Sequence, residues 1–279
     1  MKAILLNLSA WIMLPIMDGF AKYLSLTLPV LQITWARYFF TVIIVFPIIF
    51  FFYRKNLKFS EKPKLQLIRG MLLFSANVLF FYSISVIPLS KALTLAFVAP
   101  LIVTSLSPIF LNEKVGLNRW IAVFFGFVGC LIIIRPGFIE LNLATIAALG
   151  TGLMYGFYLI VTRKLSSVDN PLLTLFLTGV VGATLGSFMM PLTWVYPSLN
   201  EWLIMFLIGL FASIGHFLLI LSLKFADASK LAPFGYFEIL PNMLIGFYFF
   251  NHLPDNFDFL GLIIIVLSGL YIFKSERNI

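Results

Sequence analysis

The chain has 279 residues, of which 61% are hydrophobic and 11% are charged, and its formal net charge is +8 at pH 7. About a quarter of the residues of a soluble domain are charged, so this composition excludes a water-soluble core. The positive charge does not indicate a nucleic-acid partner, because the basic residues lie in short loops between apolar segments, as in membrane proteins. The single cysteine, Cys130, excludes an internal disulfide.

Apolar runs between charged, Pro, Gly and Asn breaks predict an all-α integral membrane protein with ten transmembrane helices, each of about 20 residues. We expect the segment after Met1 to be the first span and not a cleaved signal peptide. The connections are too short to hold a separate soluble domain. The predicted spans are 4–24, 31–53, 66–87, 92–111, 118–134, 142–162, 171–193, 202–223, 231–250 and 257–274.

The distribution of basic residues predicts the orientation in the membrane. With the N-terminus in the cytoplasm, fifteen of the 19 Lys and Arg residues, Arg69 among them, fall on the inner side. Two (Lys91 and Arg135) fall on the outer side and two (Lys22 and Arg37) within spans. The positive-inside rule therefore predicts a multi-pass protein of the inner (plasma) membrane with both termini cytoplasmic.

The two halves of the chain are similar at an offset of 139 residues, at which Asn112 aligns with Asn251. Each half contains five predicted spans, and because five is odd, the second half enters the membrane from the opposite side. We therefore predict two inverted five-helix repeats, 1–139 and 140–279. Such repeats are typical of alternating-access carriers with a binding site near the membrane midplane.

Several motifs resemble those of one known family. They are "WARYFF" in the second span, "FVAPLI" followed by "FLNEKVGLNRW" around the fourth, and Glu-x-x-Pro in the ninth. With ten short helices in two inverted fives, the chain is similar over essentially its whole length to the EamA family of the drug/metabolite transporter superfamily. The resemblance implies a secondary transporter.

Within that family, "MDGFAKYL", "WARYFF" and "APFGYFEI" most resemble the S-adenosylmethionine uptake carriers of intracellular bacteria. The chain departs from them at Phe234 and Gly235, where those carriers have Tyr and a basic residue. The resemblance implies S-adenosylmethionine as the substrate.

Ionisable residues within spans mark the candidate pathway, because such groups normally face the protein interior or a wet cavity. They are Asp18, Arg37, His216 and Glu238, with Lys22 near the outer end of the first span. Asp18 can pair with Lys22, four residues away on the same helix face, or with Arg37. Two interpretations stay open: an ion-pair network that joins the first two spans, or a site in which Arg37 or Lys22 binds a substrate carboxylate. Lys22 can also extend to the outer interface.

Glu238 is the strongest candidate for substrate binding. The aligned residue of the first half is Ala99, so the repeated scaffold does not require a carboxylate there. Phe234 and Tyr236 lie nearby, and Phe234 would share a helix face with Glu238. A carboxylate among aromatic rings suits a substrate ammonium or sulfonium group. The alternatives are a protonated Glu bonded to a neighbouring helix, and a site for proton exchange.

The other candidates are weaker. His216 is either a hydrogen-bonded packing residue or a proton-coupling group. Possible wall residues are Trp11, Trp35, Tyr38, Asn77, Tyr82, Tyr155 and Tyr158.

The sequence thus predicts a secondary transporter for a small zwitterionic or cationic metabolite that is amino-acid-like, with S-adenosylmethionine as the first choice. The alternative is an exporter of amino acids, other metabolites or drugs. An intramembrane enzyme or a channel is a remote alternative, because no zinc or nucleophile motif is present and the buried charges break the internal symmetry. We expect no cofactor or metal. The expected partners are a small-molecule substrate and membrane lipid, and the sequence does not indicate an oligomeric state.

Overall fold

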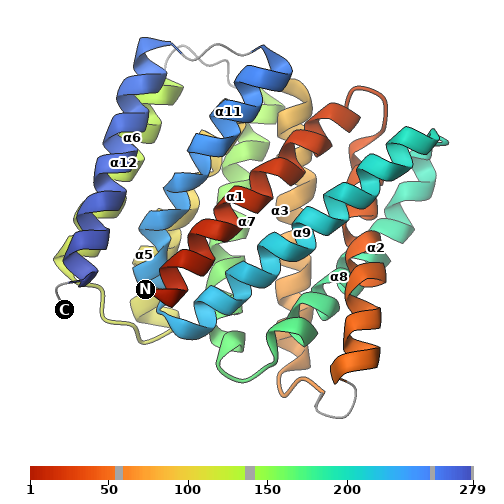
Figure 1. Ribbon diagram of the computed structural model, residues 1–279, viewed down its shortest axis with the longest axis horizontal. Helices are drawn as coiled ribbons and strands as arrows, with labels where there is room; N and C mark the ends of the chain where they lie inside the picture. Colours follow the sequence, from red (N-terminus) through yellow and green to blue (C-terminus); the bar gives the residue numbers. More distant parts are fainter. Residues whose placement is uncertain (54–58, 136–141, 252–254, 278–279) are drawn as a thin grey trace.

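The computed structural model describes residues 1–53, 59–135, 142–251 and 255–277, and every regular element in these ranges is a helix. Figure 1 shows a helix bundle in which the two ends of the chain lie on the same side. The elements are α1 (Lys2–Leu24), α2 (Val30–Ile48), the π-helical turn η1 (Ile49–Tyr53), α3 (Pro63–Val86), α4 (Leu89–Ala96), α5 (Val98–Phe110), α6 (Leu117–Ile134), α7 (Leu143–Ser166), α8 (Pro171–Met189), η2 (Met190–Thr193), α9 (Leu199–Phe225), α10 (Ala228–Leu231), η3 (Ala232–Glu238), α11 (Ile239–Phe250) and α12 (Asn256–Arg277).

Within the described residues, eight helical segments are long and apolar enough to cross a membrane, with α4 and α5 counted as one. The helix α6 is apolar but shorter. The prediction of an all-α membrane protein is therefore confirmed. The count of ten spans stays a prediction, because the ninth predicted span, 231–250, is not a continuous α-helix.

That ninth segment is divided into α10, the 3₁₀-helix η3 and α11. Its two prolines, Pro233 and Pro241, lack the N–H groups that would bond to carbonyls one turn earlier in an α-helix. A 3₁₀-helix has three residues per turn, so residues three apart share a face. Ala232, Gly235 and Glu238 all face the same cavity, which is described below.

The most extensive contacts join α1 with α9, α3 with α7, α2 with α8, and α6 with α12. Figure 1 shows α1 running beside α9, and α12 in front of α6. Each of the four pairs joins one helix of residues 1–139 to one of residues 140–279. The core therefore lies between the two halves of the chain.

Close approach of α7 to the break between α4 and α5 depends on Gly152. A Cβ atom on this residue would lie 2.4 Å from the carbonyl oxygen of Ala96 and 2.5 Å from a methyl carbon of Val98. Real Cβ atoms essentially never come this close to other atoms. Glycine thus lets helix backbones touch, as small residues do in membrane bundles.

Substitution of Gly152 with Ala tests this packing. We expect the purified variant to unfold at a lower temperature than the wild type, by the equivalent of about 1–3 kcal/mol, because overpacking must displace backbone. Thermal unfolding in detergent measures the effect. Gly269→Ala is the matched control, since a Cβ there meets no atom within 4 Å. Equal melting temperatures for the two variants would contradict the close contact.

Candidate functional site

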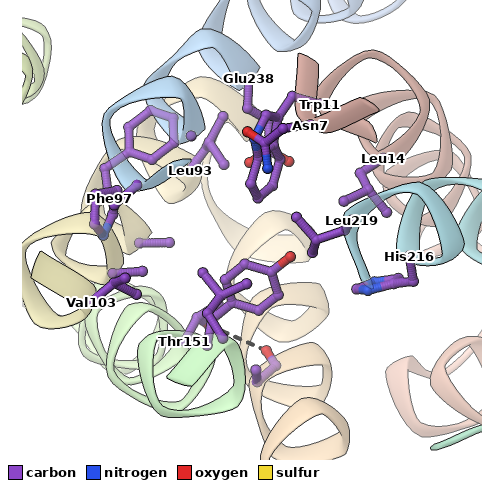
Figure 2. A pocket seen from close by; sticks show the side chains of 18 of the residues that line it. Asn7, Trp11, Leu14, Leu93, Phe97, Val103, Thr151, His216, Leu219 and Glu238 are labelled. Atoms are coloured by element: carbon purple, nitrogen blue, oxygen red, sulfur yellow. Dashed lines mark hydrogen bonds between the residues drawn. The ribbon is translucent and has the colours of Figure 1, made fainter. Parts of the chain in front are cut away.

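A cavity of about 900 Å³, its open mouth included, lies between helices of the two halves. Its wall comes from α1, α3, α4, α5, α7, α9, α10 and η3. Figure 2 shows Glu238 and Trp11 on one side of the space, Phe97 on a second and His216 on a third. The wall extends to Ala228, the first residue of α10.

Two carboxyl groups face this cavity, Asp18 from α1 and Glu238 from the last turn of η3. Only 3% of Asp18 and 8% of Glu238 is exposed. Oδ1 of Asp18 is buried without a hydrogen-bond partner. Among the described residues, no Lys or Arg lies within ion-pair distance of either carboxylate. The site therefore holds two acidic groups whose charge the protein leaves without a close partner.

The predicted pair between Asp18 and Arg37 is not formed. Nε of Arg37 donates instead to Sδ of Met17 (3.4 Å), and its guanidinium carbon lies 4.4 Å from the ring centre of Tyr38. Arg37 lines a second, smaller cavity of about 230 Å³ and not the main one. Among the described residues, Arg37 therefore makes no direct ion pair with Asp18, and it does not line the main cavity.

Lys22 also lies apart from Asp18. Its Nζ atom donates to the backbone oxygens of Ile84 (2.7 Å) and Ile87 (3.1 Å). These carbonyls end α3, where a cation stabilises the negative end of the helix dipole. Lys22 therefore joins α1 to the end of α3 and does not line the cavity.

Three of the predicted wall residues lie at the cavity: Trp11, Asn77 and Tyr155. The rings of Trp11 and Tyr155 meet edge to face, with centroids 6.4 Å apart. The indole N–H of Trp11 donates to Oδ1 of Asn7 (2.7 Å), and the amide of Asn77 donates to the hydroxyl of Tyr38 (3.0 Å). Trp11 is thus held by Asn7, which also lines the cavity, whereas the hydroxyl of Tyr155 is buried without a hydrogen-bond partner among the described residues.

Phe234 and Tyr236 do not line the cavity. Tyr236 packs against Phe97 with ring centroids 5.3 Å apart, and its hydroxyl donates to the oxygen of Val123 (3.3 Å). The prediction that Phe234 shares a face with Glu238 assumed an α-helix. Because η3 is a 3₁₀-helix, Gly235 occupies the position next to Glu238 on the cavity side.

Trp35, Tyr82 and Tyr158 are also outside the main cavity. The indole of Trp35 donates to Oγ of Ser187 (3.0 Å). Tyr82 is 38% exposed on the outside of the bundle. Tyr158 is fully buried and lines the smaller cavity, together with His216, which lines both.

Arg69 was predicted only as one of the basic residues of the inner side, and not as a residue of the core. Arg69 is fully buried in α3. Its guanidinium donates to Oγ1 of Thr162 (2.8 Å), the hydroxyl of Tyr158 (2.8 Å), the oxygen of Thr174 (3.2 Å) and Oγ1 of Thr178. Arg69 is the fourth residue of the predicted span 66–87, and this position was the signal that could have identified it as a buried residue.

Comparison with known proteins places the chain in a family. The model of the EamA-like transporter family matches residues 1–135 and 142–274. The chain belongs to the EamA-like transporter family. It is therefore a multi-pass membrane protein of a bacterial transporter family, which is consistent with the inner membrane. The family and the names of its relatives indicate a transporter and not an enzyme.

Three relatives of this EamA-like transporter differ in their named substrates. An S-adenosylmethionine uptake transporter of Rickettsia bellii is 28% identical, with 94% of this chain and 89% of the relative covered. A riboflavin transporter of Vibrio cholerae is 27% identical, with 97% and 92% covered. The pseudopaline exporter of Pseudomonas aeruginosa is 24% identical, with 99% and 98% covered.

A solved crystal structure has the same fold as this transporter. It superposes with a TM-score of 0.82 at 16% identity and covers 99% of this chain and 98% of its own. Among the described residues, no group of three or more His, Cys, Asp and Glu side chains is placed to hold a metal ion.

Two substitutions distinguish the carboxylate site from the scaffold. Asp18→Asn removes a charge but breaks no ion pair, so we expect a folded yield and melting temperature close to the wild type. Arg69→Ala removes the donor from several buried acceptors, each at a cost of about 1–3 kcal/mol, so we expect a much lower melting temperature. Size-exclusion chromatography and thermal unfolding measure both. Loss of folded protein in Asp18→Asn alone would contradict this assignment.

Proposed function

We propose that this transporter is a secondary carrier for a small zwitterionic or cationic metabolite. The metabolite is amino-acid-like, with S-adenosylmethionine as the first choice, and it crosses the inner membrane by alternating access. The observation that carries the proposal is the pair of carboxyl groups, Asp18 and Glu238, in one cavity, with no ion pair to either of them in the part of the chain that the structure describes.

A positively charged substrate supplies what these carboxylates lack. An ionised acidic side chain at the centre of a membrane helix costs about 2.5–3.5 kcal/mol on insertion scales. A ligand ammonium or sulfonium group offsets that cost only while it is bound, and the rings of Trp11 and Tyr155 add aromatic faces for a cation or a planar base. Without substrate, protonation of Glu238 would serve the same purpose, so that proton and substrate exchange at one site.

The names of the relatives bear on the choice of substrate. The relatives named as S-adenosylmethionine uptake transporters support the first choice of substrate. The relative named as an exporter supports the alternative, which is export of an amino-acid-like compound through the same cavity.

Alternating access is supported by the way helices pair. If residues 1–139 and 140–279 are inverted repeats, α1 and α3 correspond to α7 and α9. The contact of α1 with α9 then corresponds to that of α7 with α3, and both are extensive. A pseudo-two-fold relation of this kind lets one half rock against the other around a central site.

In each half of the chain, a basic side chain near the end of one helix donates a hydrogen bond to a backbone oxygen near the end of another helix. Lys22, near the end of α1, donates to the oxygen of Ile84 (2.7 Å). Arg163, near the end of α7, donates to the oxygen of Leu223 (2.7 Å). Ile84 and Leu223 are 139 residues apart, which is the repeat offset. We propose that these contacts hold the two ends of the pathway in turn.

The inner of the two contacts is part of a larger polar network. Glu113 accepts a hydrogen bond from Nε of Arg163 (3.2 Å) and from the backbone N–H groups of Ala228 and Ser229 (2.9 Å each). The start of α10 is thus tied to α7 and to the loop after α5, and Ala228 at this start also lines the cavity. Both termini lie on the same side as this network, which we propose to be the cytoplasmic side.

Glu238→Gln tests the proposal. We expect uptake of S-adenosylmethionine into proteoliposomes to fall at least about tenfold, because a hydrogen bond to a charged group contributes about 1.5–3 kcal/mol. Yield and melting temperature should stay near the wild type. Glu61→Gln is the matched control, since Glu61 is an exposed carboxylate in the loop before α3, and its uptake should be unchanged.

Full transport by Glu238→Gln would overturn the site. Thermal stabilisation of the wild type by a panel of amino acids, amines, nucleosides, riboflavin and S-adenosylmethionine tests the substrate class. No stabilisation by any amine-bearing or sulfonium compound would contradict the preference for a positive group.

A further inference from the structure

We infer that Arg69 and Tyr158 hold His216 in one neutral tautomer, with its proton on Nε2. This N–H is then a hydrogen-bond donor for the carboxylate of a zwitterionic substrate. The role toward substrate rests on the proposed function, whereas the tautomer rests on the contacts alone.

Three buried side chains form a chain of hydrogen bonds from α3 to α9. Nη2 of Arg69 donates to the hydroxyl oxygen of Tyr158 at 2.8 Å. The same hydroxyl lies 3.0 Å from Nδ1 of His216. Arg69 and Tyr158 are fully buried and His216 is 3% exposed, so water does not compete for these contacts.

The number of protons available to these two hydrogen bonds decides the tautomer of His216. A guanidinium has donors and no acceptor, so the oxygen of Tyr158 accepts from Arg69. The single hydroxyl proton of Tyr158 then needs an acceptor. Within the part of the chain that the structure describes, Nδ1 of His216 is the acceptor in hydrogen-bond range of this hydroxyl. Nδ1 therefore carries no proton, and Nε2 of the neutral ring does.

The alternative protonation states fit these contacts poorly. If Nδ1 carried a proton, the hydroxyl proton of Tyr158 would stay unbonded in a buried site, at the cost of an unmade hydrogen bond. A doubly protonated ring would also place a third positive charge beside Arg37 and Arg69, which line the same small cavity as His216.

The other side of the ring faces the main cavity. His216 is part of the wall of both cavities, and Figure 2 shows its ring pointing from α9 toward the open space, on a different side from Glu238. Arg37 and Lys22 do not line this cavity. The N–H groups of Trp11 and Asn77 already donate to other residues, whereas the hydroxyl of Tyr155 lines the cavity without a hydrogen-bond partner among the described residues and is a second neutral donor. His216 is thus placed as a neutral N–H donor on a different side of the wall from Glu238.

The acidic groups and the N–H donor of His216 match the positive and negative groups of a zwitterion. The ammonium or sulfonium group would lie at Asp18 and Glu238, and the carboxylate would accept from Nε2 of His216. In this account His216 orients the substrate and does not carry the coupled proton. Tyr158 and Arg69 are positioning residues that act through His216.

Nitrogen NMR of histidine in the full-length purified protein tests the tautomer. With ¹⁵N-labelled histidine and a His252→Gln background, one imidazole is observed. We expect the Nε2-protonated neutral form at pH 7. Tyr158→Phe should change the signal to a mixture of tautomers, whereas Tyr82→Phe, at an exposed tyrosine, should leave it unchanged. An Nδ1-protonated or doubly protonated ring in the Tyr158-containing protein would overturn the inference, whether or not Tyr158→Phe folds.

Binding of two ligands tests the role toward substrate. His216→Ala should weaken S-adenosylmethionine binding about tenfold or more, because a bond to a charged acceptor is lost. Binding of decarboxylated S-adenosylmethionine should change less than about twofold. Equal weakening of both ligands would overturn the role of His216. Failure of the wild type to bind either ligand would refute the proposed substrate, and the NMR result would still decide the tautomer.

Discussion

The structure depends on one electrostatic constraint, which is that two carboxyl groups share a cavity and that neither forms an ion pair with a Lys or Arg among the described residues. Buried charges are normally paired, because desolvation costs more than a single hydrogen bond returns. Here Arg37, Lys22 and Arg69 are all bonded elsewhere, so the protein leaves Asp18 and Glu238 for a partner from outside. We propose that a bound cation or an exchanged proton meets this requirement during transport.

The backbone around Glu238 is what brings its carboxylate to the cavity. Two prolines interrupt the helix, and the 3₁₀ segment between them places every third side chain on the cavity side. Gly235 then leaves space beside Glu238, while Tyr236 does not line the cavity and packs against the wall residue Phe97. An unbroken α-helix would instead have placed Phe234 on the same face. The break therefore decides which neighbours the carboxylate has.

Most of the fold could be predicted from the sequence, because apolar length and loop charge are strong signals, and helices occupy each predicted span. The carboxylates were identified for a related reason, since a charge inside an apolar run is rarely accidental. Side-chain partners could not be predicted. Arg37 of α2 contacts α1, as expected, but it bonds to Met17 and not to Asp18. Arg69 was assigned to the loop charges, although four hydrogen bonds hold it in the core. Residue spacing predicts which side chains share a face of one helix. It does not predict which side chains of another helix they contact.

A structure of the transporter determined with S-adenosylmethionine bound is the most direct test of the central claim. We predict that the ligand lies in the main cavity, with its sulfonium or ammonium group within hydrogen-bond or ion-pair distance of Glu238 or Asp18. A ligand whose positive groups contact neither carboxylate, or which lies outside the cavity lined by Trp11 and Tyr155, would contradict it.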